Sequence, residues 1–204
     1  MLDPPPEGTE RTYAGLTEYA DKDAVHLGGN QLEGDPFSYS PGVWDYVITR
    51  FAVRSVLDVG SGIGYSADYF FRRGVRVIAI DGLHDNIRQA VYPTVKVDLT
   101  QTGVHCTVDL VHCQELVEHI EEKYLDNLLS TLANGRFLLM THAIPGQPGH
   151  HHVNCQPSEY WISHMERYGF KCLIEDTQRI RKIARREGAF YLGQAGLMLS
   201  NPNR

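Results

Sequence analysis

A glycine-rich turn between two β-branched runs is the feature that most restricts the fold of this chain. The stretch "VLDVGSGIGYSADYFFRRGVRVIAIDG" spans residues 56–82 and has glycines at positions 60, 62 and 64. A short apolar run precedes the turn, a segment of helical character follows it, and a second apolar run ends the stretch. This order predicts a right-handed βαβ unit with two parallel strands.

The same alternation continues toward the C-terminus. Runs of apolar and β-branched residues predict seven strands, at residues 54–60, 75–82, 94–98, 107–115, 136–143, 170–176 and 194–201. Helical spacing predicts helices at residues 41–51, 64–74, 83–91, 116–135 and 158–169, and an amphipathic basic helix at 179–188. The pattern indicates an α/β fold, a doubly wound Rossmann-like sheet of seven mostly parallel strands.

Composition limits the kind of protein and its partners. The net charge of −6 argues against a sequence-independent nucleic-acid binder, which needs clustered lysine and arginine. No apolar run is long enough to span a membrane, and the start lacks the features of a signal peptide. Four cysteines without a CxxC pair favour a reducing, cytoplasmic location.

The spacing of the turn indicates its ligand. Gly60-x-Gly62-x-Gly64 departs from the GxGxxG pattern that cradles a dinucleotide pyrophosphate. Asp58, just before the turn, would repel a pyrophosphate and suits a ligand that carries an amine. Asp81 ends the next strand, where a carboxylate bridges ribose hydroxyls. A nucleoside with a cationic tail and no phosphate is S-adenosylmethionine, and the alternative is a Rossmann-like fold that holds NAD or nothing.

Three motifs together resemble the class I S-adenosylmethionine-dependent methyltransferases. They are "LDVGSGIGY…VIAIDG", "VDL" at residues 97–99 and "DLVHCQELVEHI", within residues 53–140. The resemblance implies an antiparallel last strand, contact of Asp58 with the cofactor's ammonium, and recognition of adenine by the Asp98 carboxylate and the Leu99 N–H. The implied cofactor-binding set is Asp58, Gly60, Ser61, Gly62, Gly64, Asp81, Gly82, Asp98, Leu99, Cys113 and Gln114.

The segment "QELVEHIEE" is predicted to place Glu115, Glu118 and His119 on one helical face. Acids in a first helical turn complement the helix dipole without any ligand. The ExxEH spacing also resembles the divalent-metal motif of ubiquinone-biosynthesis O-methyltransferases and of methyltransferases that modify small-RNA 3′ ends. That resemblance implies bound Mg²⁺ or Mn²⁺, which would lower the pKa of a coordinated hydroxyl. Both interpretations remain open.

Histidines near the ends of the fourth and fifth strands are candidates for a general base. The candidates are His142, His151 and His152, of which the last two belong to the loop "HHHVNCQPSEYW". The amides and aromatic rings of that loop suit a hydroxylated acceptor.

The predicted domains are an N-terminal tail or lid segment, residues 1–40, and a methyltransferase domain, residues 41–204. Tyr13, Tyr19, His26 and Tyr39 of the first segment could line a lid. The predicted function is in-line methyl transfer to a hydroxyl of a small or sugar-like molecule, with no nucleic-acid or membrane partner. The alternatives are a metal-assisted RNA 2′-O-methyltransferase and a non-catalytic cofactor-binding or scaffold protein. The acceptor's identity and the oligomeric state stay open.

Overall fold

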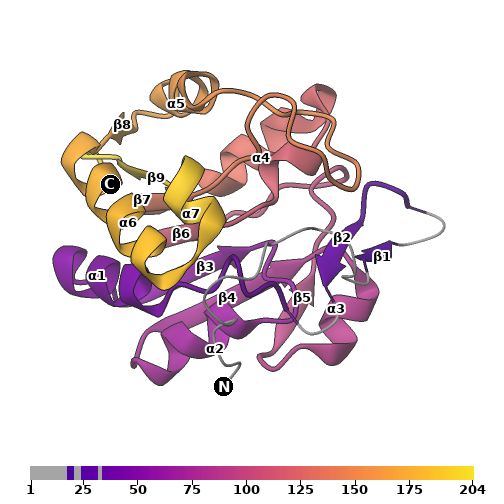
Figure 1. Ribbon diagram of the computed structural model, residues 1–204, viewed down its shortest axis with the longest axis horizontal. Helices are drawn as coiled ribbons and strands as arrows, with labels where there is room; N and C mark the ends of the chain where they lie inside the picture. The colour runs from indigo at the N-terminus through magenta and orange to yellow at the C-terminus, as the bar shows by residue number, and fades with distance from the viewer. Residues whose placement is uncertain (1–17, 21–23, 32–33) are drawn as a thin grey trace.

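The computed structural model describes residues 18–20, 24–31 and 34–204, so Tyr13 lies outside the described residues. A seven-stranded sheet forms the centre of the molecule, with helices on both faces (Figure 1). Its strands are β3 (Ser55–Val59), β4 (Arg76–Asp81), β5 (Thr94–Lys96), β6 (Val108–Cys113), β7 (Gly135–Met140), β8 (Lys171–Cys172) and β9 (Leu197–Ser200). A separate two-stranded sheet joins β1 (Glu18–Ala20) to β2 (Gly28–Gln31).

The strand order is β5-β4-β3-β6-β7-β9-β8. The pairs among β3 to β7 are parallel, whereas β9 pairs antiparallel with both β7 and β8. The prediction of a mostly parallel seven-stranded sheet with an antiparallel last strand is therefore confirmed. The order reverses at β3, so the carboxyl ends of β3, β4 and β6 lie beside one another at the place where such sheets bind ligands.

The helices are α1 (Pro41–Phe51), α2 (Tyr65–Arg72), α3 (His84–Gln89), α4 (Leu125–Leu132), α5 (Ser158–Glu166), α6 (Ile174–Glu187) and α7 (Phe190–Ala195). Two short 3₁₀ helices, η1 (Val117–His119) and η2 (Glu122–Tyr124), precede α4. No helix of the described chain combines the length and the apolarity that a membrane span requires.

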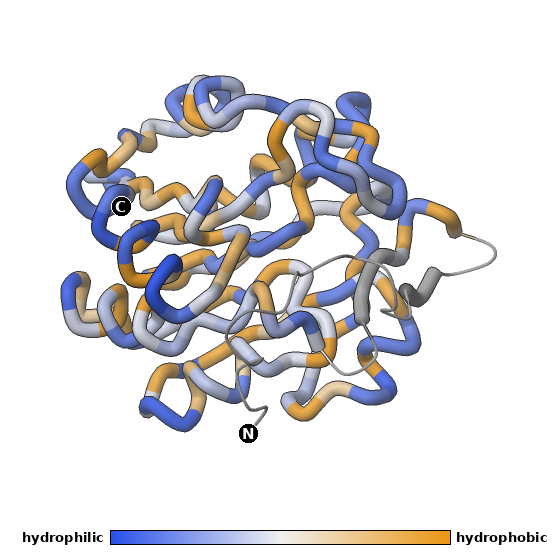
Figure 2. Tube along the Cα trace, viewed as in Figure 1, coloured by the Kyte–Doolittle hydropathy of each residue, from blue (hydrophilic) through white to orange (hydrophobic). Residues whose placement is uncertain are grey.

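Neighbouring strand residues point to opposite faces and fill two separate cores. Leu138 packs beneath α4 and α5 with Trp161, while Leu139 packs beneath α1, α6 and α7 with Trp44. Figure 2 shows apolar residues recurring along the central strands, whereas α6 is largely polar. The basic helix predicted at residues 179–188 lies mostly within α6, and Ile180 and Ala184 are on the buried side of α6.

Two predicted elements near the C-terminus were wrong in extent. The strand predicted at residues 170–176 ends after Cys172, because α6 already begins at Ile174 with two acidic residues in its first turn. Helix α7 occupies Phe190–Ala195, so the last strand begins at Leu197 rather than at residue 194.

The helix predicted over residues 116–135 is interrupted. Glu115 adopts a positive φ of 49°, and only the 3₁₀ turns η1 and η2 form before α4 begins at Leu125. The Glu118 carbonyl accepts hydrogen bonds from the backbone N–H groups of Val153 and Asn154, at 3.0 Å each. This carbonyl therefore serves a distant loop instead of an i→i+4 helical bond.

We expect Leu138→Ala to destabilise the protein by about 2–5 kcal/mol, because Leu138 is fully buried and its loss leaves a cavity. Urea denaturation measures the free energy of unfolding. The control is Ile174→Ala, since Ile174 is 66% exposed and its loss should change the free energy by less than about 0.5 kcal/mol. Equal losses in the two variants would contradict this account of the core.

Candidate active site

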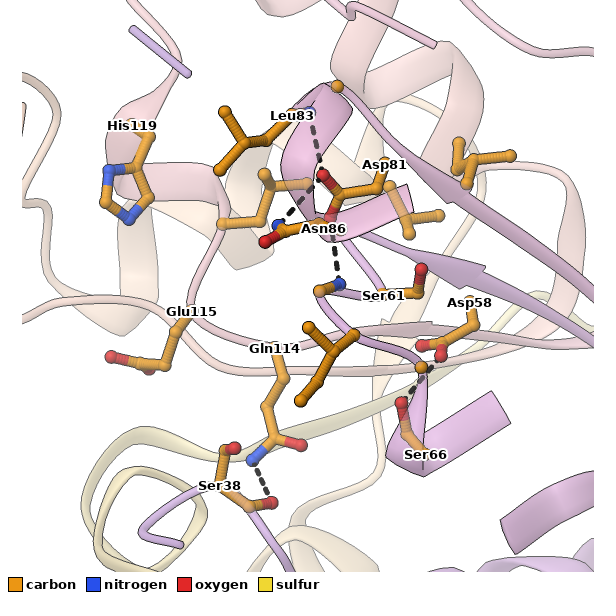
Figure 3. A pocket seen from close by; sticks show the side chains of 18 of the residues that line it. Ser38, Asp58, Ser61, Ser66, Asp81, Leu83, Asn86, Gln114, Glu115 and His119 are labelled. Carbon is orange, nitrogen blue, oxygen red and sulfur yellow. Dashed lines mark hydrogen bonds between the residues drawn. The ribbon is translucent and has the colours of Figure 1, made fainter. Parts of the chain in front are cut away.

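A cavity of about 190 Å³ lies at the carboxyl ends of β3, β4 and β6 (Figure 3). The glycine turn lines it, and the N-terminal segment contributes residues 26–28, 34–35 and 38–39. The lid predicted for residues 1–40 remains a prediction, but His26 and Tyr39 do line this cavity.

The glycines of the turn are required by its backbone. Gly60, Gly62 and Gly64 have φ angles of 68°, 57° and 83°, which side chains with a Cβ rarely adopt. Gly64 is the residue before α2, so the turn leads directly into the amino end of that helix. The backbone N–H groups of Gly60 and Ser61 donate to the Ile80 carbonyl, which fixes the turn to the neighbouring strand.

Asp81 holds the two βα turns together. Its carboxylate accepts the N–H of Gly62 at 2.8 Å, the N–H of Leu83 at 2.8 Å and the Asn86 amide at 3.1 Å. Burial raises the pKa of Asp81 to about 6, although these hydrogen bonds oppose the shift. Asp81 and Gly82 both line the cavity, in the position predicted for the carboxylate that takes the ribose.

Asp98 lies at another end of the cavity, with Leu99 beside it. One carboxylate oxygen accepts the hydroxyl and the N–H of Thr100, at 2.7 and 2.9 Å, and the other lies 3.1 Å from His26 Nε2. Burial raises the pKa of Asp98, but the hydrogen bonds from Thr100 and His26 outweigh it and leave the pKa below its usual value. The role in adenine recognition remains a prediction, and the contact with His26 was not foreseen.

Asp58 is almost fully buried, and both its oxygens have partners. They lie 2.6 Å from His112 Nδ1 and 2.6 Å from the Ser66 hydroxyl (Figure 3 shows the latter). The Trp44 indole N–H donates to His112 Nε2 at 3.2 Å, so Nδ1 carries the proton given to Asp58. Contact of Asp58 with the cofactor's ammonium remains a prediction. In the structure, the hydrogen bond between Asp58 and His112 links β3 to β6.

Of the two cofactor-binding residues predicted at the end of β6, Gln114 lines the cavity and Cys113 does not. Gln114 lines the cavity and its amide donates to the Ser38 carbonyl at 2.8 Å. Cys113 is fully buried in the core beneath the sheet and does not line the cavity. The alternation of the strand turns the Cys113 side chain away from the cavity, and its contact with the cofactor remains a prediction.

The histidine loop supplies His152, which the sequence offered as a candidate general base, to a cluster of possible metal ligands. Ligand atoms of Glu118, His119 and His152 lie within 4.8 Å of one another, a grouping that could hold a metal ion. The His119 and His152 rings are 5.0 Å apart between centroids. Glu115, predicted as a third ligand beside Glu118 and His119, lies outside this cluster, and His152 takes its place.

Glu118 is the buried member of the cluster, whereas His119 and His152 are half-buried. Glu118 is 0% exposed, and its carboxylate makes no hydrogen bond of ordinary geometry with the described residues, although the Ala143 backbone and the Glu115 side chain lie close enough to lower its pKa. Burial raises the pKa of Glu118 to about 7, and burial and the charge of Glu118 raise the pKa of Glu115 well above its usual value. Burial, with the nearby His152, lowers the pKa of His119 to about 3, so this imidazole is neutral and able to coordinate a cation.

The other predicted bases lie away from the cavity. His142 is buried beneath α5, where Nε2 lies 3.0 Å from the Ser158 hydroxyl, and it does not line the cavity. His151 has a positive φ of 47° and does not line the cavity either. These positions argue against both residues as the base that receives the acceptor's proton.

Comparison with known proteins identifies the family. The profile of the methyltransferase domain matches residues 38–175, which is more than half of the chain. No curated protein matches the chain. The fold and the site define a class I S-adenosylmethionine-dependent methyltransferase, and the chain belongs to the methyltransferase domain family.

Solved structures share the fold at low sequence identity. An S-adenosylmethionine-dependent methyltransferase from Archaeoglobus fulgidus has a TM-score of 0.54 at 17% identity, over 82% of this chain and 94% of that one. Magnesium protoporphyrin IX methyltransferase from Synechocystis, solved with bound S-adenosylmethionine, has 0.52 at 16% identity, over 78% and 77%. The cyclase SpnF has 0.54 at 17% identity, over 79% and 80%. Since one of these is a cyclase, the fold alone does not determine the reaction.

We expect binding of S-adenosylhomocysteine to strengthen as the pH rises to about 6 and then to level off, because Asp81 holds a proton below that pH. Ligand binding through the Asp81 carboxylate must release this proton. Calorimetry in buffers of different ionisation enthalpy measures both the affinity and the proton released.

Asp81→Asn should lower the affinity by roughly tenfold to a hundredfold and remove the proton release, since a charged acceptor is lost. The control is Asp85→Asn, an exposed acid of α3 whose replacement should change neither quantity. Unaltered proton release in Asp81→Asn would show that another group titrates.

Proposed function

We propose that this methyltransferase methylates a hydroxyl oxygen of a small molecule and that Glu118, His119 and His152 hold a divalent cation, Mg²⁺ or Mn²⁺, at the acceptor end of the cavity. The observation that carries the proposal is the grouping of the fully buried Glu118 carboxylate with His119 and His152, whose ligand atoms all lie within 4.8 Å of one another. A buried charge of this kind is costly unless it is paired or coordinates a metal.

The donor set favours Mn²⁺ over Mg²⁺, because imidazole nitrogens suit transition metals whereas Mg²⁺ prefers oxygen ligands. One carboxylate and two imidazoles leave coordination positions open for water and for an acceptor hydroxyl. When bound, such a cation lowers the pKa of a coordinated hydroxyl, which prepares the oxygen for methyl transfer. His119 also lines the cavity, so the cluster borders the space next to the glycine turn.

The protein's own residues would then align the reaction and receive the proton. The acceptor oxygen attacks the methyl carbon, the carbon–sulfur bond breaks, and its electron pair stays on sulfur. Glu115 lines the cavity, and its Oε1 has no hydrogen-bond partner in the described part of the chain. We assign to this oxygen the acceptance of the hydroxyl proton, in place of the histidine base predicted from the sequence.

The metal part of the proposal has a test that does not depend on activity. Titration with Mn²⁺ followed by electron paramagnetic resonance should show one tight site whose affinity rises between pH 6 and 8, because Glu118, with a pKa of about 7, must lose its proton to coordinate. His152→Ala should weaken Mn²⁺ binding by at least about tenfold, the effect typical of losing one ligand.

The matched control lies in the same loop. His151→Ala removes a neighbouring histidine that is outside the cluster, so its Mn²⁺ affinity should equal that of the wild type. Equal weakening by the two substitutions, or no Mn²⁺ binding by the wild type, would contradict the assigned ligands.

The reaction itself is tested with S-adenosylmethionine labelled in its methyl group. Glu118→Gln should abolish the methyl transfer that Mn²⁺ stimulates. It should leave the affinity for S-adenosylhomocysteine, measured by calorimetry, unchanged, because Glu118 does not line the cavity. Glu122→Gln is the control, since Glu122 is an exposed acid of the adjacent turn. A product methylated on nitrogen or carbon, or activity insensitive to chelator, would overturn the O-directed, metal-assisted proposal.

A further inference from the structure

The described lining of the cavity has acidic side chains but no lysine or arginine. Five carboxylates line it, which are Asp35, Asp58, Asp81, Asp98 and Glu115. Two basic residues of the chain, Arg11 and Lys22, lie outside the described residues. An occupant of the described cavity therefore finds many hydrogen-bond acceptors and no permanent cation.

The carboxylates at the cofactor end are already satisfied. Asp58 has His112 and Ser66, Asp81 has two backbone N–H groups and Asn86, and Asp98 has Thr100 and His26. These donors satisfy the carboxylate oxygens where the cofactor is predicted to bind. The remaining acidic character gathers at the other end.

That other end is formed by Asp35, Glu115 and the neighbouring Glu118. The charge of Asp35 contributes to the raised pKa of Glu115, so the two carboxyl groups act on each other. One oxygen of Glu115 and both of Glu118 make no hydrogen bond of ordinary geometry with the described residues. A divalent cation at Glu118 would be balanced by Glu118 and Glu115 together, which leaves no excess positive charge to receive an anion.

Neutral acceptors of hydrogen bonds complete this end. The Ser38 carbonyl, with Gln114 bonded to it, borders the cavity, and Figure 3 shows Ser38, Gln114, Glu115 and His119 around one open space. Hydroxyl groups donate to such oxygens, whereas phosphate, sulfate and carboxylate groups cannot.

We infer that the methyl acceptor is an uncharged molecule with several hydroxyl groups, such as a sugar or a phenol, and that Asp35 and Glu115 exclude acceptors bearing phosphate or carboxylate groups. This inference rests on the proposed function and adds the charge of the substrate to it. A buried anion would face the carboxyl groups of Asp35 and Glu115 with no lysine or arginine in the described lining, an arrangement that disfavours binding.

The test compares matched acceptors that differ in one anionic group. Suitable pairs are a methyl glucoside with glucose phosphate, catechol with dihydroxybenzoate, and adenosine with adenylate, each assayed for transfer of labelled methyl in the presence of Mn²⁺. In every pair that is used, we expect the neutral member to be favoured in kcat/KM by at least about tenfold, as like-charge contact predicts.

A charge variant distinguishes exclusion by charge from exclusion by size. Asp35→Asn keeps the shape and can still accept the Phe37 N–H, which bonds to Asp35 at 2.8 Å. It should raise the relative kcat/KM for anionic members several-fold. The control is Asp45→Asn, because Asp45 is exposed on α1 and pairs with Arg73 on the surface, so the preference should not change.

The outcomes separate this inference from the proposed function. O-methylation of the anionic members at equal or higher kcat/KM would overturn the inference and leave the proposed function standing. Absence of transfer to every hydroxyl compound, by protein that binds S-adenosylhomocysteine in calorimetry, would overturn the proposed function and the inference with it. An unchanged preference in Asp35→Asn would remove Asp35 as a determinant of specificity.

Discussion

The parallel pairing of β3 with β4 and with β6 is the constraint on which the site depends. Parallel strands end at the same edge of the sheet, so the turns that follow them meet in one place. The register pairs Asp58 directly with His112, and these side chains then form a buried hydrogen bond of 2.6 Å. The Asp81 carboxylate at the end of β4 accepts a hydrogen bond from the Gly62 N–H and so joins β4 to the turn that follows β3. The cavity is thus a consequence of strand register, held by two buried acids.

The residues close together in sequence could be predicted from the sequence. The glycine turn needs positive φ angles at three alternate positions, which a local pattern reveals. Asp81 is likewise specified by its place at the end of a strand. The helix expected after β6 failed for a non-local reason, since the Glu118 carbonyl bonds to Val153 and Asn154, which follow it by more than thirty positions. Contacts of that kind leave no signal in helical periodicity.

The sequence placed Glu115 among the metal ligands for the same reason, although the structure leaves it outside the cluster. Spacing alone grouped Glu115 with Glu118 and His119, on the assumption of a regular helix. The positive φ at Glu115 breaks that geometry, while the bonds from Val153 and Asn154 to Glu118 bring His152 to the cluster. His112 was missed because only the register of β6 against β3 places it beside Asp58. A histidine and an aspartate near the ends of two predicted strands were the available signal.

The N-terminal segment connects the two ends of the cavity. His26 contacts Asp98 at the predicted adenine end, and the neighbouring Val25 carbonyl accepts a 2.8 Å hydrogen bond from His150 Nε2. His150 belongs to the same loop as His152, which forms the cluster with Glu118 and His119. Both bonds use exposed or half-exposed groups, so each is individually weak and the two together contribute little to the stability of the fold.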